Sequence, residues 1–242
     1  MKKAFLLLTA AMVCCATFAS ADNFVTYATR AQQNPTDFID WTQLGPDVTI
    51  SQMGIPSPSP VVTSLGHSAM VGNTNGGDFL RVDAGLGWIN SHFALGESLV
   101  WTGNSQIVGS GGPLKIALAS PAGSVGFGIE PNSFGPFTVR VDLYDVSSNP
   151  IGSVSFSANE TICGSNCFQG DEFFVGIGDT TGVNIGAIVI NSDTGDPFFA
   201  DDLTIDNPGF TYTTATPEPC TLVLMGTAVV GLTRGRRRKM KA

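Results

Sequence analysis

A strict alternation of apolar and polar residues between Phe137 and Tyr144 is the feature that most limits how this chain folds. Apolar side chains stand at every second position of this segment, and mostly polar side chains stand between them. Because successive side chains of a strand point to opposite faces, the pattern predicts a strand with one face on a core and one in water. The turn-forming residues of 147–150 should then reverse the chain into the next strand.

Other short apolar runs recur along the 242 residues and are separated by turn-forming residues. The composition is rich in Gly, Ser, Thr, Asn and Phe and poor in Lys, Glu and Leu, which disfavours helices. About ten strands at this spacing predict an all-β fold, an antiparallel β-sandwich of jelly-roll type with few helices. The further runs are 79–82, 114–118, 125–129, 154–156, 173–177, 185–190 and 203–205.

The N-terminus has the pattern of a secretory signal peptide. Lys2 and Lys3 precede an apolar run, and Ala19-Ser20-Ala21 fits the small-x-small cleavage pattern. We therefore expect residues 1–21 to be a signal peptide that signal peptidase removes after Ala21. Lipid attachment at Cys14 or Cys15 is the weaker alternative, because Val13 stands before Cys14 where a small residue is required.

Near the C-terminus, a Pro-Glu-Pro box, an uncharged segment and a basic cluster follow one another. The uncharged residues 220–233 would span about 21 Å as a helix, against about 30 Å for a hydrocarbon core. Long basic side chains can extend this span and hold its end on the cytoplasmic side. The pattern predicts a short transmembrane helix, with a plain tail anchor or a lipid-binding basic tail as alternatives. The box is Pro217, Glu218 and Pro219, and the basic tail 234–241 includes Arg234, Arg236, Arg237 and Arg238.

This order of parts resembles the PEP-CTERM sorting signal of bacterial surface proteins. The resemblance implies that residues 215–242 are a sorting signal that a membrane transpeptidase, exosortase, reads and cleaves. It also implies a precursor inserted in the cytoplasmic membrane and a final location in the cell envelope or extracellular matrix. Exosortase systems accompany exopolysaccharide production, so polysaccharide is an implied partner.

Residues 22–214 are then the extracytoplasmic domain, and residues 122–207 carry a second resemblance. Their order of strands is similar to jelly-roll sandwiches found ahead of this signal, whose last core strand carries a step like Asp201-Asp202-Leu203. Galactose-binding-like and lectin-like modules share that form. The resemblance implies a fold and names no ligand.

Removal of the two processed ends makes the protein strongly acidic. The formal charge is −8 for the whole chain, whereas residues 22–216 hold four basic and nineteen acidic side chains, a formal charge of −15. Such a surface repels nucleic acid and anionic glycans, which excludes a nucleic-acid partner. It suits neutral sugars, divalent cations or a cationic partner, and it equally serves to keep a secreted β protein soluble.

Two cysteines remain in this region, Cys163 and Cys167. In an exported protein such a close pair is typical of a disulfide that pins a loop. A metal site is the alternative, but no second cysteine pair or histidine stands nearby in the sequence.

Four aspartates within ten residues are candidate calcium ligands, because calcium takes several oxygen ligands. They are Asp193, Asp196, Asp201 and Asp202, of which Asp201 and Asp202 are the better candidates. A plain turn is the alternative interpretation, since Asp and Gly are usual turn formers.

Three tryptophans, Trp41, Trp88 and Trp101, would serve either to stack on sugar rings or to fill the core, and we expect the core. No catalytic residues emerge. The segment around His67 and Ser68 lacks the second glycine of a nucleophile elbow.

The sequence thus predicts an exported, non-catalytic protein with a structural or carbohydrate-binding role in the envelope or exopolysaccharide. The alternative is a secreted polysaccharide-active enzyme with the same sorting tail. Calcium is the candidate cofactor.

Overall fold

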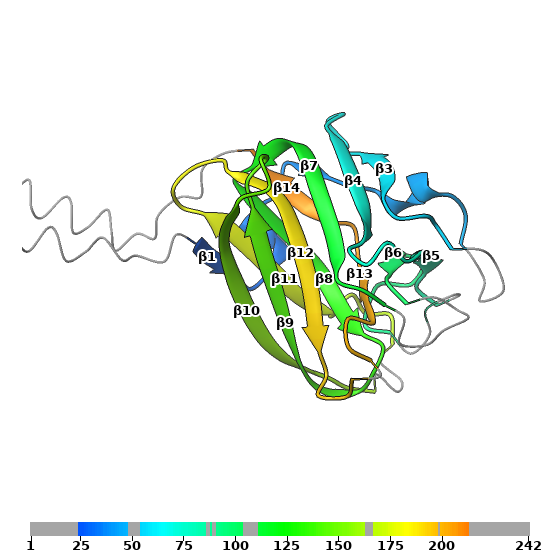
Figure 1. Ribbon diagram of the computed structural model, residues 1–242. Coiled ribbons are helices and arrows are strands. Elements are labelled where there is room, and N and C mark those ends of the chain that lie inside the picture. The colour runs from blue at the N-terminus through cyan, green and yellow to red at the C-terminus, as the bar shows by residue number, and fades with distance from the viewer. Residues whose placement is uncertain are drawn as a thin grey trace, which may run out of the picture.

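The computed structural model describes residues 24–47, 54–85, 88, 91–103, 111–162, 167–197 and 199–212. These residues form two antiparallel sheets, so the predicted all-β sandwich architecture is confirmed. Figure 1 shows the sheets as layers, with β9, β12 and β7 of one sheet lying across β8, β11 and β13 of the other.

The first sheet has the order β1-β11-β8-β13-β6-β5, with β14 pairing β2 and β8. Its strands are β1 (Phe24–Tyr27), β2 (Asp37–Phe38), β5 (Leu80–Asp83), β6 (Ser98–Trp101), β8 (Ser124–Pro131), β11 (Phe173–Asp179), β13 (Leu203–Ile205) and β14 (Gly209–Thr211). The second sheet has the order β10-β9-β12-β7-β4-β3. Its strands are β3 (Ser59–Val62), β4 (Ser68–Asn73), β7 (Leu114–Ala122), β9 (Gly135–Tyr144), β10 (Pro150–Glu160) and β12 (Ile185–Asp193).

Helix is scarce in the described part of the chain, as the composition predicts. It is confined to α2 (Arg30–Gln33) and one 3₁₀ turn, η1 (Trp41–Leu44). None of the described helices is long and apolar enough to cross a membrane. The predicted signal peptide and the segment 220–233 lie outside the described residues.

The alternation in β9 produces the expected two faces. Phe137, Val139, Val141 and Leu143 are buried in the core between the sheets, whereas the side chains between them are more exposed. The predicted turn after β9 is also present. Asp145 closes it by accepting hydrogen bonds from the backbone N–H groups of residues 147 and 149, both at 2.8 Å.

Strand β8 is buried along its whole length, which requires cover on both faces. One face packs Val125, Phe127 and Ile129 into the main core. The other face presents Gly126 and Gly128, where Gln33 and Glu172 approach the backbone so closely that a Cβ would collide with them. Glycine in β8 therefore allows α2 and the chain before β11 to lie against the outside of the sheet.

A smaller apolar cluster lies on the first sheet near β5 and β6. It contains two of the three tryptophans, Trp88 and Trp101, whose rings lie 5.5 Å apart. Trp41 belongs to the main core. The exposed fractions of the three side chains are 0% for Trp41 and 8% for each of the others, in agreement with the expectation that they fill the interior.

Candidate functional site

A groove lies where the edges of the two sheets meet. Strand β10 pairs only with β9, and β1 pairs with β11 only over 176–179, so the start of β11 has one described neighbour, β8. Strand β10 and the start of β11 leave between them a hollow of about 980 Å³. We call it the edge groove. It is lined by residues 26–30, Gln32, His92, Phe156, 158–161 and 170–174.

The apolar wall of the edge groove comes from both sheets. On β10, period-two alternation puts Phe156, Ala158 and Glu160 on one face, so this row ends in a carboxylate. Phe173 of β11 meets Phe156 edge to face, with ring centroids 6.5 Å apart. Phe173 and Phe174 are both half-buried and lie on opposite faces of β11, so aromatic surface extends around its edge.

At one end the groove is bounded by α2. Thr29 caps this helix by accepting a hydrogen bond from the backbone N–H of Gln32 at 3.2 Å. Arg30 reaches inward, where its guanidinium forms an ion pair with Asp206 and lies 5.4 Å from the ring centroid of Phe174. Asp206 is 1% exposed and burial raises its pKa to about 7, so its carboxyl group balances the charge of Arg30 inside the protein where it is ionised.

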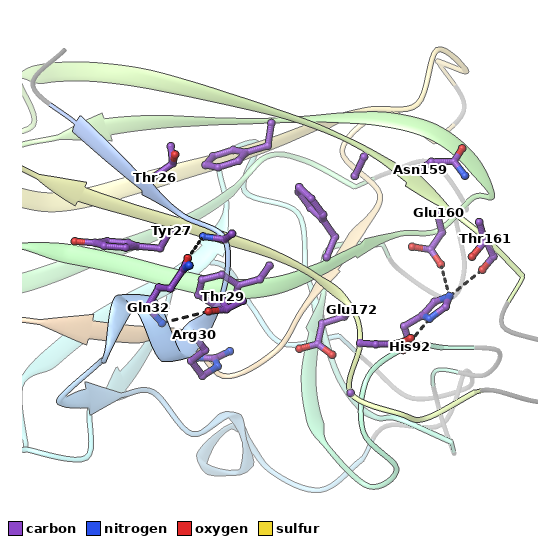
Figure 2. A pocket seen from close by; sticks show the side chains of 17 residues that line it. Thr26, Tyr27, Thr29, Arg30, Gln32, His92, Asn159, Glu160, Thr161 and Glu172 are labelled. Carbon is purple, nitrogen blue, oxygen red and sulfur yellow. Dashed lines mark hydrogen bonds and ion pairs between the residues drawn. The ribbon is translucent and has the colours of Figure 1, made fainter. Parts of the chain in front are cut away.

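At the other end, His92 is held by three acceptors, as Figure 2 shows. Its Nδ1 lies 3.0 Å from Oδ1 of Asp171, and its Nε2 lies 3.1 Å from the carbonyl of Thr161 and 3.5 Å from Oε1 of Glu160. Burial alone would lower the pKa of His92, but the hydrogen bonds to Asp171 and Thr161 and the nearby carboxylates outweigh it and raise the pKa.

Two buried glutamates lie behind His92. Glu130 of β8 accepts hydrogen bonds from the backbone N–H of His92 at 2.6 Å and from Nε1 of Trp88 at 3.0 Å. Burial raises the pKa of Glu130. Burial, reinforced by the charge of Glu130, raises the pKa of Glu160 to about 7. This end of the groove therefore holds protons near neutral pH.

Glu172 lies in the middle of the groove, between Arg30 and the His92 cluster (Figure 2). Its Oε2 is shielded from solvent and has no hydrogen-bond partner among the described residues. Burial raises the pKa of Glu172. Glu172 also lines the groove, so its carboxyl group adds a hydrogen-bonding group to the lining.

The predicted calcium ligands lie elsewhere. Asp202 is fully buried, with Oδ1 accepting from Nε1 of Trp101 at 2.5 Å and Oδ2 accepting from Nδ2 of Asn132 at 3.0 Å. Oδ1 of Asp201 accepts from the backbone N–H of Ser192 at 2.8 Å. The described residues contain no group of three or more histidine, cysteine or carboxylate side chains that could hold a metal ion. Calcium binding at Asp201 and Asp202 stays a prediction.

Other residues singled out from the sequence have structural surroundings. Asp193 accepts from the backbone N–H of Gly195 at 2.8 Å and so forms a turn. Ser68 begins strand β4, and the ring of His67 packs on Tyr212 with centroids 4.4 Å apart. Cys163 lies outside the described residues, so its disulfide with Cys167 stays a prediction. Ala19, Ala21 and the sorting motif at 217–238 also lie outside them.

The sequence did not identify the edge groove, because its residues come from four separate segments, 26–32, 92, 156–161 and 170–174. One local signal was available. The alternation of β10 puts Glu160 on the same face as Phe156, and a carboxylate that ends an inward-facing apolar row indicates a site.

Comparison with known proteins adds little to this geometry. The chain matches no protein-family profile and no curated protein. Among solved structures it is similar to a DUF4465 family protein from Bacteroides caccae, with 12% identity and a TM-score of 0.36 over 78% of this chain and 100% of that one.

Proposed function

We propose that this chain is an exported, non-catalytic protein whose β-sandwich binds a neutral polysaccharide in the edge groove. The observation that carries the proposal is the pairing of half-buried aromatic rings with polar side chains along one hollow. Phe156, Phe173 and Phe174 supply the rings, and Glu160 and Glu172 line the same hollow.

A sugar ring suits this lining for simple chemical reasons. Its C–H faces are apolar and pack on aromatic rings, while its hydroxyls exchange hydrogen bonds with carboxylates and amides. Ligand sites in proteins commonly combine an apolar lining with a few placed polar groups in this way.

The charges of the groove favour a neutral ligand. Its basic side chains are Arg30 and His92, and both already face carboxylates of the protein. Glu160, Asp171 and Glu172 make the rest of the ionisable lining acidic, and burial raises the pKa of Glu160 to about 7 and also raises that of Glu172. A polymer of uronic acids would meet like charge here, which disfavours binding.

The location and sorting of the protein are part of the same proposal. The order of residues 215–242 supports recognition of Pro217, Glu218 and Pro219 by exosortase after export. We also propose the jelly-roll form of the sandwich, supported by crossovers such as the one that places β12 between β9 and β7.

One observation favours the alternative, a polysaccharide-active enzyme. A buried carboxylic acid such as Glu160, with a pKa of about 7, has the property required of a general acid. Release of reducing ends from a bound polysaccharide, abolished in Glu160→Gln, would support the enzyme. Binding without any release supports the non-catalytic role.

A glycan array tests the proposal. The exported protein should bind neutral glycans on the array and should not bind anionic ones, both in the presence and in the absence of calcium. Phe156→Ala removes an aromatic ring of the groove and should abolish retention, whereas Ser157→Ala, an exposed neighbour on β10, should not. Loss of binding in both variants, or binding of anionic glycans alone, would contradict the proposal.

A further inference from the structure

A second hollow of about 520 Å³ lies on the other side of Glu160. The turn between β8 and β9 contributes Asn132 and Phe134 to its lining, and the loop between β12 and β13 contributes Phe199. Trp88 and Glu130 also line it. We call it the end hollow.

The two hollows meet at one side chain. Glu160, the last residue of β10 and 8% exposed, lines both of them. Glu130 fixes the wall behind it, since one carboxylate oxygen bonds Trp88 of the end hollow and the other bonds the backbone of His92 in the edge groove. The hollows therefore share Glu160 and are neighbours on the surface.

We propose that the edge groove and the end hollow form one track for a continuous polysaccharide chain that crosses Glu160. This inference rests on the proposed function and deepens it, because it assigns the ligand as an internal stretch of a polymer. The edge groove alone is near the upper end of the volumes typical of small-molecule sites, roughly 300–1,000 Å³, and the end hollow adds to it. A single sugar would leave most of this space empty.

Phe134 is the platform at the far end of the track. Its side chain is 56% exposed and lines the end hollow, so a sugar ring can stack on it. The charges agree with those of the edge groove. Glu130, Glu160 and Asp196 line the end hollow and no basic side chain does, so the same neutral polymer suits both parts.

Oligosaccharide length tests the track. The full-length protein in mild detergent is titrated with neutral cello-, xylo- and manno-oligosaccharides of two to six units. For the oligosaccharide series that binds, the affinity should rise at least tenfold from the dimer to the hexamer. Phe134→Ala should lower hexamer affinity about tenfold and leave dimer affinity unchanged, and Phe134→Trp should retain hexamer binding.

Phe38→Ala is the matched control, because Phe38 is 48% exposed on β2 and lines neither hollow. It should bind like the parent protein. Equal affinity for all lengths, with no effect of Phe134→Ala, would overturn the track and leave the groove proposal standing. If none of the three oligosaccharide series binds, the proposed function and the track are both overturned.

Discussion

The indole Nε1 of Trp101 donates a hydrogen bond to Oδ1 of Asp202 at 2.5 Å, inside the smaller apolar cluster of the sandwich. Asn132 donates to the other oxygen of Asp202. Asp202, one of the two aspartates that suggested a calcium site from the sequence, thus already accepts hydrogen bonds from two protein donors. Its role in the fold is to join β6, the end of β8 and the start of β13.

Asp202→Ala should therefore destabilise the protein by about 2–3 kcal/mol, since two buried donors lose their acceptor. Urea unfolding followed by tryptophan fluorescence measures the change. Equal melting temperatures of the parent protein in calcium and in EDTA would show that Asp202 acts through these hydrogen bonds alone. A drop of several degrees in EDTA that Asp202→Ala abolishes would instead establish a calcium site at this position.

Arg30 stabilises the protein mainly by balancing the buried charge of Asp206. Arg30→Met leaves that carboxylate unpaired and should cost about 2–3 kcal/mol, less than fully buried pairs because the Arg30 side chain is 36% exposed. Arg140→Met is the control, since Arg140 also pairs with an aspartate but its side chain is 60% exposed. It should unfold at the same urea concentration as the parent. Equal losses in both variants would contradict this account.

Acid should stabilise the protein through the His92 end of the groove. The pKa values of Glu160, Glu130 and His92 are raised in the folded state, so the folded protein binds more protons than the unfolded chain near neutral pH. The free energy of unfolding should therefore fall as the pH rises from about 4.5 to about 7 through the glutamates, and above about 6.5 through His92. Asp171 and the carbonyl of Thr161 also face His92 and belong to the same cluster.

Glu160→Gln measures the share of one group in this effect. The parent should lose about 2 kcal/mol of unfolding free energy between pH 5 and pH 8 through Glu160, and the variant should show a flatter dependence. Urea titrations at the two pH values give the comparison. An unchanged slope in Glu160→Gln would show that Glu160 does not hold the proton.

Processing at the C-terminus tests the sorting proposal. In cells that carry an exosortase, mass spectrometry of the mature protein should find a C-terminus near Pro217. Substitution of Pro217, Glu218 and Pro219 by alanine should lead to an intact tail that ends at Ala242. An intact tail in the unsubstituted protein would count against cleavage.

The local parts of the fold could be predicted from the sequence, and its assembly could not. The alternation around Val139 and Val141 and the turn at Asp145 depend on neighbours in the chain, and both are present as expected. The groove depends on which strands remain at the sheet edges. That order is set by packing between distant segments, so no local pattern brings His92 next to Glu160.

The acidic residues also show that local sequence patterns do not reveal which residues meet in a site. The sequence pattern assigns no role to Glu172 or Glu160, whereas both are buried in one groove of the structure. The aspartate cluster at 193–202 had the more suggestive spacing. Two of its members, Asp193 and Asp201, accept hydrogen bonds that organise a turn and a strand end.

Chemical-shift mapping on the labelled protein tests the central claim most directly. Titration with the neutral oligosaccharide selected by the array should shift backbone amides at 156–160 and 172–174, with little change on β3 and β4 at the far side of the second sheet. Shifts confined to β3 and β4, or none at saturating ligand, would contradict binding in the edge groove.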